Sequence, residues 1–441
     1  MSLAWISVGA LVLAVTLSCT TAINVGLVAL ALALTVGVLI GDMTPAAVLD
    51  GFPVDLFITL VGVTLLFAIA EVNGTLERLT ARAVRLCRGH AGLLPIMFFV
   101  LGFAIATIGA GATPASALLA PPAMAIAARA RIPPLLMVIM TGNGTLAGTL
   151  SPFAPTGIVA HGVMQRIGLG GVEWQTFAYN ALAHTLVGVG GFLLLGGWRL
   201  FRTTAPGVDG APRAAGMPPG PSSAAVGADA PISEVGAGGA VRDAPFEPRH
   251  WLTAAGIAAL ICAVAGFEIN VGMAALIIAT LLIALRAVEE RRAIAHMPWG
   301  VILMVTGVTV LVALLQETQG LALITDGIAR LSTPLTIEPV VAFGTGLVSV
   351  YSSTSGVVLP AFLPMAPQLA ERLGGLDPLS IAWSMNVSAS LVDLSSLSTV
   401  GALYIAGAGP GTDARKLFNA LLAWGMSMTV VGAALCYFLF G

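Results

Sequence analysis

Charged residues are scarce in this sequence. Only 9% of its 441 residues are Asp, Glu, Lys or Arg, whereas 57% are hydrophobic. A typical soluble domain has about 25% charged residues, so this chain lacks the polar residues needed to cover a soluble core. Apolar segments near the ~20 residues that cross a bilayer recur from end to end of the chain. The sequence therefore predicts an all-α polytopic membrane protein whose main partner is the lipid bilayer.

Lysine is nearly absent. The only lysine, Lys416, stands in Asp413-Ala414-Arg415-Lys416-Leu417, which has none of the glycines of a phosphate-cradling loop. An ATP-driven pump needs such a loop together with its lysine, so the sequence excludes an ATPase site of that kind. The net charge of -2 indicates no nucleic-acid partner.

Cysteine is also rare. The four cysteines stand singly, without the spacing of metal ligands, and we interpret them as small core residues: Cys19, Cys87, Cys262 and Cys436. We expect no resident cofactor.

Intramembrane hydrolases are the alternative class outside transport. An aspartyl type needs two acids within the membrane, but only Asp393 lies deep in an apolar span. A serine type needs a Ser and His pair in the core. Ser355 belongs to an isolated Ser-Gly, and His161 and His184 fall near predicted span ends in the other half of the chain. These patterns favour a protein that is not an enzyme.

The chain contains one internal repeat. Four matches recur in the same order, 243 to 246 positions apart: Ile23-Asn24-Val25-Gly26 with Ile269-Asn270-Val271-Gly272, Gly62-Val63-Thr64 with Gly307-Val308-Thr309, Asn143 with Asn386, and Gly157 with Gly401. A nearly constant spacing indicates two copies of one unit, which we place at residues 1–202 and 250–441. Residues 203–249 between them are rich in Pro, Gly, Ala and Ser and predict a disordered linker.

The arginines predict how the two copies are oriented. Arginines stand at both ends of residues 93–131, and Gly109-Ala110-Gly111-Ala112-Thr113-Pro114 interrupts the middle, so we predict a re-entrant helical hairpin that enters from the cytoplasm. The second copy has a comparable interrupted segment at 338–372. With the first residue outside, ten spans and two hairpins result, and sixteen of the nineteen basic residues, like the linker, are cytoplasmic. The copies then have inverted topology in the cell (inner) membrane.

Each copy also contains a helix that should break. In residues 133–167, Pro152 and Pro155 remove backbone donors and clash with the preceding turn. In residues 378–408, the polar run Ser395-Ser396-Leu397-Ser398 takes the matching place. Unpaired backbone groups at membrane depth are tolerated only in buried protein or beside a watery cavity. Broken helices at equivalent places in two halves indicate a transporter binding site.

The two hairpins and two broken helices each place a helix N-terminus near the middle of the membrane. Its partial positive charge can hold an anion without an arginine. The substrate-binding candidates at these places are Thr113, Pro155, Thr156, Gly157, Ser352, Ser353, Thr354, Ser398 and Thr399. Freed carbonyls beside Ser151 and Ser395 are hard oxygen ligands suited to Na+. The alternative is that these hydroxyls bond their own helices and that Gly and Pro only permit close packing.

Three further polar side chains lie near the breaks. Asn143 and Asn386 stand at equivalent places, about two turns before each break. They either ligate a cation and brace the loop or make interhelical hydrogen bonds. Asp393 has no counterpart in the first copy. An ionisable residue at this depth is functional by default, so we assign it to Na+ or proton coupling, the alternative being a structural acceptor of backbone amides.

At this point the pattern resembles a known superfamily. Two inverted repeats, each with a hairpin and a broken helix, resemble the ion transporter superfamily that includes the divalent anion:sodium symporters. The runs Ser151-Pro152-Phe153-Ala154-Pro155-Thr156-Gly157 and Asp393-Leu394-Ser395-Ser396-Leu397-Ser398-Thr399-Val400-Gly401 are most similar to its malonate/dicarboxylate carrier branch. The resemblance covers the chain apart from the linker. It implies a homodimer in which a transport domain slides past a fixed scaffold, an elevator motion.

The resemblance also implies residues at the hairpin tips. The divalent anion symporters carry Ser-Asn-Thr at each tip, where it binds substrate carboxylate and sodium. Counted back from Pro121 and Pro360, the matching positions are Gly111-Ala112-Thr113 and Val350-Tyr351-Ser352, of which only the third keeps a hydroxyl. Gly111, Ala112 and Tyr351 thereby join the cation-binding candidates, and Asp393 is expected to replace part of that coordination.

Together these patterns predict a secondary active transporter. It is expected to import a small dicarboxylate, malonate or a C4-dicarboxylate, coupled to Na+ or H+. The alternatives within transport are a carrier of another oxyanion and a cation/proton exchanger of the same superfamily.

Overall fold

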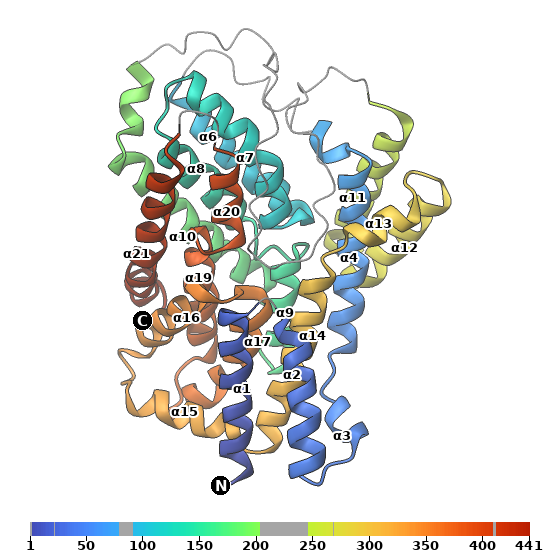
Figure 1. Ribbon diagram of the computed structural model, residues 1–441, viewed down its shortest axis with the longest axis vertical. Coiled ribbons are helices and arrows are strands. Elements are labelled where there is room, and N and C mark those ends of the chain that lie inside the picture. Colours follow the sequence, from blue (N-terminus) through green and yellow to red (C-terminus); the bar gives the residue numbers. More distant parts are fainter. Residues whose placement is uncertain (1, 22, 79–90, 203–245, 268, 409–411) are drawn as a thin grey trace.

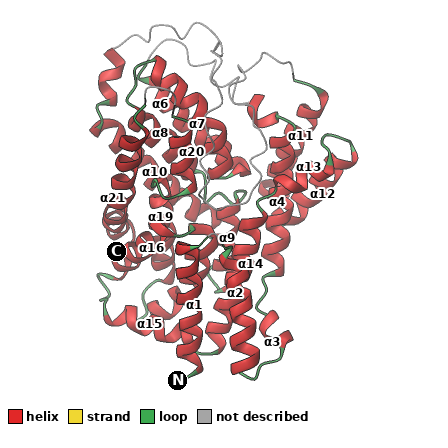
Figure 2. Ribbon diagram, in the orientation of Figure 1, coloured by secondary structure: helices red, strands yellow, loops and turns green. Residues whose placement is uncertain are grey.

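The structure is a computed structural model that describes residues 2–21, 23–78, 91–202, 246–267, 269–408 and 412–441. Every regular element in these ranges is a helix, and they contain no strand (Figures 1 and 2). The all-α prediction is therefore confirmed. The predicted linker lies outside the described residues as far as residue 245.

The helices follow the predicted order of the two copies. The first copy contains α1 (Leu3–Thr20), α2 (Val25–Leu34) with the turn η1 (Thr35–Ile40), α3 (Pro45–Leu49), α4 (Val54–Val72), α6 (Leu93–Ile105), η2 (Ala106–Ala110), α7 (Ala112–Arg129), α8 (Pro134–Ala147), α9 (Pro155–Arg166), α10 (Glu173–Leu194) and η3 (Gly197–Arg202). The second contains α11 (Pro248–Phe267), α12 (Val271–Ala284), α13 (Glu290–His296), α14 (Trp299–Glu317), α15 (Gly320–Arg330), α16 (Ile337–Tyr351), η4 (Thr354–Val358), α17 (Leu359–Phe362), η5 (Leu363–Met365), α18 (Ala366–Arg372), α19 (Pro378–Leu391), η6 (Val392–Leu394), α20 (Thr399–Ala406) and α21 (Ala414–Phe440).

Many of these helices are apolar enough to lie in a membrane. Within the described residues, six segments are also long enough to cross one: Val54–Val72, Leu93–Ala110, Glu173–Leu194, Trp299–Glu317, Pro378–Ala406 and Ala414–Phe440. Six more apolar helices are shorter. The protein is therefore a multi-pass membrane protein, as its composition predicted.

Glycines of the repeated motifs join the two copies reciprocally. Gly26 on α2 lies against α14 so closely that an added Cβ would overlap the α14 backbone, and Gly307 on α14 faces Gly26 in the same way. In the matching contact, Gly272 on α12 packs against the backbone of α4, and a Cβ added to Gly62 on α4 would lie 2.5 Å from the carbonyl oxygen of Gly272. Small residues permit such close helix approach in membranes. Since α2 pairs with α14 as α12 pairs with α4, the copies are related by an approximate two-fold axis.

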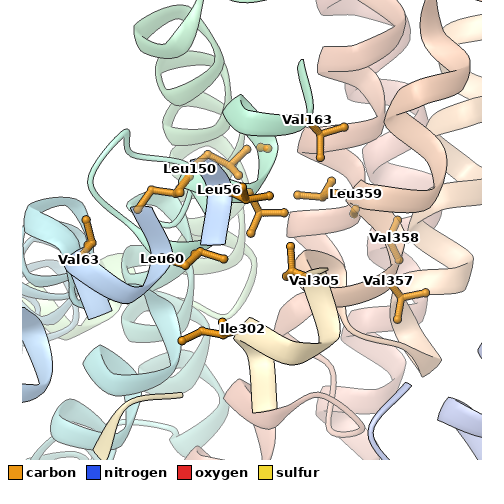
Figure 3. Close-up of a cluster of buried hydrophobic side chains, with 14 of the residues drawn as sticks. Leu56, Leu60, Val63, Leu150, Val163, Ile302, Val305, Val357, Val358 and Leu359 are labelled. Carbon is orange, nitrogen blue, oxygen red and sulfur yellow. The ribbon is translucent and has the colours of Figure 1, made fainter. Parts of the chain in front are cut away.

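The two predicted hairpins lie in different parts of the molecule. In Figure 1, α6 and α7 occupy the upper part, whereas α16 and α17 lie in the lower part. The apolar core between them is shown in Figure 3, where side chains of α4 and α14 meet side chains of the first broken helix and the second hairpin. The labelled residues are Leu56, Leu60, Val63, Leu150, Val163, Ile302, Val305, Val357, Val358 and Leu359.

The prediction for the cysteines is partly wrong. Cys436 is buried, as expected, but Cys262 on α11 is exposed. An apolar span has an outer face toward lipid, where a small thiol is as compatible as in the core.

Candidate functional site

The tip of the first hairpin lies against the first broken helix. The chain turns at Gly109 and Gly111, whose φ angles of 123° and 77° are left-handed and favour glycine. A Cβ added to Gly111 would lie 3.1 Å from Pro155 Cδ. The Ser151 hydroxyl donates to the Thr107 carbonyl at 2.6 Å. The candidates Gly111, Pro155 and Ser151 are thus brought together.

The first broken helix opens where its prolines predicted. α8 ends at Ala147, and α9 begins at Pro155, the first helical position, where a missing N–H costs least. The Gly157 amide donates back across the break to the Thr149 carbonyl at 3.0 Å. Neighbouring Thr156 is half-buried, and its hydroxyl makes no hydrogen bond within the described residues.

The second hairpin holds the only acid of the candidate site. Thr354, which begins η4, donates through its hydroxyl to Asp393 Oδ1 at 2.5 Å, and Ser349 on α16 reaches the same oxygen at 3.4 Å. Ser349 and Thr354 also bond each other through their hydroxyls. Because these contacts use Oδ1, Oδ2 of Asp393 is left without a hydrogen bond from the described part of the chain. None of the ion pairs in that part includes Asp393.

The second broken helix repeats the first with more polar side chains. Ser398 caps α20 by accepting from the Gly401 amide at 3.1 Å, and its hydroxyl donates to the Asp393 carbonyl oxygen. Ser395 accepts from the Leu397 amide at 3.3 Å, as Ser151 accepts from the matching amide of the first break. Thr399, the first residue of α20, is exposed.

The first hairpin also contacts the second broken helix. Its second arm, α7, packs against α20, and the Tyr404 hydroxyl on α20 approaches the Ser116 hydroxyl on α7 to 3.5 Å. Ser116 in turn bonds Thr145 on α8 at 2.9 Å. Leu394, beside Asp393, meets Gly142 on α8. The four breaks therefore belong to one packed unit.

A buried histidine joins the two broken helices. His184 on α10 is fully buried, with Nδ1 2.9 Å from Asn143 Oδ1 and Nε2 3.0 Å from the Ser390 hydroxyl. The Asn143 amide nitrogen donates to Ile139 O, so Asn143 Oδ1 accepts from Nδ1–H, and Nε2 accepts from Ser390. A neutral imidazole satisfies both partners. Asn143 therefore makes interhelical hydrogen bonds here.

The sequence-based interpretation of His184 is wrong. The residue lies in the middle of α10 rather than near a span end, and it does pair with a serine in the core. Asn180 and His184 lie one turn apart, and both bond α8 or its end, so this polar pair within an apolar span was the signal that sequence reasoning missed. Ser390 and His184 are both fully buried and line neither described cavity, so this pair has no access to a substrate.

Several buried oxygens at the breaks have no partner within the described residues. They are the side-chain oxygens of Thr107, Ser352, Asn386 and Ser396. Buried polar atoms are normally paired, so such atoms indicate a place for a ligand, ion or water. Ser353 instead caps Gly356 at 3.1 Å, whereas Ala112 is buried and packs in the second core cluster.

Two hairpin candidates face outward. Thr113 and Tyr351 are exposed, the latter with 55% of its surface. They are therefore not packed within the unit that holds Asp393.

Comparisons with known proteins agree with this architecture. Residues 1–149 match the family model described as the N-terminus of the dicarboxylate carrier protein MatC. Among solved structures, the fold is similar to the YdaH transporter of Alcanivorax borkumensis, with a TM-score of 0.56, 18% sequence identity, and coverage of 89% of this chain and 86% of that chain. No curated protein matches the sequence.

These findings define the class of the molecule. Its fold is that of a polytopic membrane protein similar to a solved transporter. The family match confirms, over residues 1–149, the resemblance to the dicarboxylate carrier branch that the sequence motifs predicted.

Proposed function

We propose that this protein is a secondary active transporter of a small dicarboxylate and not an enzyme. The observation that carries the proposal is the pair of broken helices packed into one unit, with Thr156 and Thr399 at the starts of α9 and α20. Amides and hydroxyls at helix N-termini bind carboxylates, and two such termini suit a ligand with two carboxylates. The match to a dicarboxylate carrier family supports this substrate class.

We assign the coupling cation to Asp393. Its Oδ1 accepts from Thr354, which leaves Oδ2 for Na+ or for a proton. The freed carbonyls of the second break and the unpaired Ser396 hydroxyl supply further oxygen ligands of the kind that Na+ prefers. No Lys or Arg occurs in the two broken loops, residues 148–154 and 392–398, so positive charge there must come from a bound cation.

An elevator motion of a homodimer in the inner membrane completes the proposal. The surfaces of α4 and α14 that meet the broken-helix unit are apolar, as Figure 3 shows. Apolar contacts are non-directional, so such surfaces can slide past one another without breaking a register of hydrogen bonds.

Uptake into proteoliposomes tests the proposed activity. We expect labelled malonate or succinate to accumulate only when an inward Na+ or H+ gradient is imposed, because the cation must compensate substrate charge. Citrate and sulfate serve as a tricarboxylate and an inorganic oxyanion. If neither gradient drives uptake of any of these anions, the proposal is wrong. Preference for sulfate would favour the carrier of another oxyanion.

Replacing the threonine hydroxyls tests the binding site. Thr156→Val and Thr399→Val should each weaken apparent substrate affinity by about 1 to 3 kcal/mol, because a desolvated carboxylate loses one donor. Thr185→Val is the matched control, since the Thr185 hydroxyl on the exposed face of α10 bonds only its own helix at Ala181 O. Affinities measured from concentration-dependent uptake should stay unchanged in the control. Unchanged affinity in both site variants would mean that the breaks serve packing.

A further inference from the structure

The larger of the two described cavities lies away from the broken helices. It has a volume of about 420 Å³ and lies where the ends of α4 and α12 meet the start of α11 and the short helix α13. Three arginines line it, and we refer to Arg249, Arg286 and Arg292 as the arginine pocket. In Figure 1 these helices lie together at the right of the molecule.

The arginine pocket carries more positive than negative charge. Arg249 Nε lies 2.8 Å from Glu247 Oε2, and Arg292 Nε lies 2.9 Å from Glu289 Oε2. Arg286 makes no ion pair within the described residues. An anion that enters the pocket therefore meets one uncompensated guanidinium and two that remain partly exposed.

Arg286 occupies a backbone position that usually takes glycine. Its φ is 57°, and it ends α12 in a Schellman arrangement, in which the Ala287 amide donates to Leu282 O at 3.0 Å and the Arg286 amide to Ile283 O at 2.9 Å. Glycine would fit this turn without strain. An arginine here indicates a use for its side chain.

The two-fold relation between the copies supplies an internal comparison. The turn that ends α2 and η1 in the first copy also has a left-handed residue, Asp42 with φ 53°, followed by α3 in place of α13. Residues 41–53 contain no Arg or Lys, whereas residues 286–298 contain three arginines. The fold therefore does not require basic residues at this turn, and the arginines are specific to one end of the molecule.

Exposed apolar side chains place the arginine pocket at the level of lipid headgroups. Trp251 and Trp299, at the same end of α11 and α14, are 59% and 38% exposed, and such tryptophans mark the membrane–water interface. Along α12 a stripe of exposed apolar residues at four-residue spacing ends beside Arg286: Met273, Ile277, Leu281 and Leu285. An acyl chain along this stripe would bring its phosphate to the pocket.

We propose that the arginine pocket binds the phosphate of an anionic phospholipid whose acyl chain lies along α12. Guanidinium groups recognise phosphate by charge-assisted hydrogen bonds, and basic pockets between membrane helices bind anionic headgroups. The proposal is independent of what the broken helices transport.

Native mass spectrometry of the full-length protein tests this proposal. The detergent-solubilised protein is incubated with phosphatidylglycerol or with phosphatidylcholine of the same acyl chains, and retained lipid is counted. We expect phosphatidylglycerol to be retained at least about tenfold more tightly, with one preferred site. Arg286→Gln/Arg292→Gln should abolish that preference. Arg415→Gln/Lys416→Gln, which removes the basic pair at the start of α21, is the matched control and should keep it.

A second variant separates lipid binding from folding. Arg286→Gly removes the guanidinium but suits the left-handed turn, so its melting temperature should be unchanged or higher while its phosphatidylglycerol preference falls. Equal retention of the two lipids by the unaltered protein would overturn the proposal, as would a preference that survives in Arg286→Gln/Arg292→Gln. Competition by inorganic phosphate as effective as competition by the lipid would show that the pocket takes a free anion instead.

Discussion

Asp393→Asn is expected to abolish gradient-driven accumulation of substrate while leaving the protein folded. Moving a dianion against an inside-negative potential of 100 mV costs about 4.6 kcal/mol, at ~2.3 kcal/mol per charge. This opposes accumulation by more than a thousandfold at about 1.4 kcal/mol per tenfold. Cotransported cations must cancel that charge, and Asp393 is the acid within the broken-helix unit that can hold one. The asparagine keeps an oxygen that accepts from Thr354, so the local hydrogen bond survives.

The measurement is uptake into proteoliposomes with and without the imposed cation gradient, together with the melting temperature of the purified variant. Asp55→Asn is the control, because Asp55 is an exposed acid in the first turn of α4. It should accumulate substrate as the unaltered protein does. Full accumulation with the same cation dependence in Asp393→Asn would show that Asp393 is a structural acceptor and that coupling lies elsewhere.

The breaks were predictable because their causes are local. Pro155 stops a helix through its own missing N–H, so the start of α9 could be read from one residue. The depth of Asp393 likewise follows from the apolar residues around it in the chain. The repeat was also legible, since its glycines recur at nearly constant spacing and then pack reciprocally between the copies.

The partners of these residues could not be predicted. Ser349 and Thr354 lie 44 and 39 positions from Asp393, and their contact depends on how the second hairpin packs against η6. His184 and Ser390 lie 206 positions apart in different copies. Hydrophobic periodicity specifies which face of a helix is buried, but it does not specify which polar atom meets which across two helices.

Gly157→Ala and Gly401→Ala are both expected to abolish transport and to lower stability. A Cβ at Gly157 would overlap the carbonyl oxygen of Ser151, and one at Gly401 would overlap the carbonyl oxygen of Ser395. In each copy the obstructing atom is backbone of the broken loop, which cannot rotate away as a flexible side chain could. We expect a loss of about 3 kcal/mol or more, at or beyond the upper end for an overpacked core.

Two other glycines provide matched controls in the same repeats. An added Cβ at Gly190 on α10 or at Gly344 on α16 meets nothing within 4 Å. Gly190→Ala and Gly344→Ala should therefore change stability by no more than about 1 kcal/mol, the difference in helix propensity, and leave transport intact. Melting temperature and uptake are measured for all four variants. If Gly157→Ala and Gly401→Ala behave like these controls, the loops are wide enough to accept a side chain. The close passage of each helix start past its own loop carbonyl would then not be what holds the breaks open.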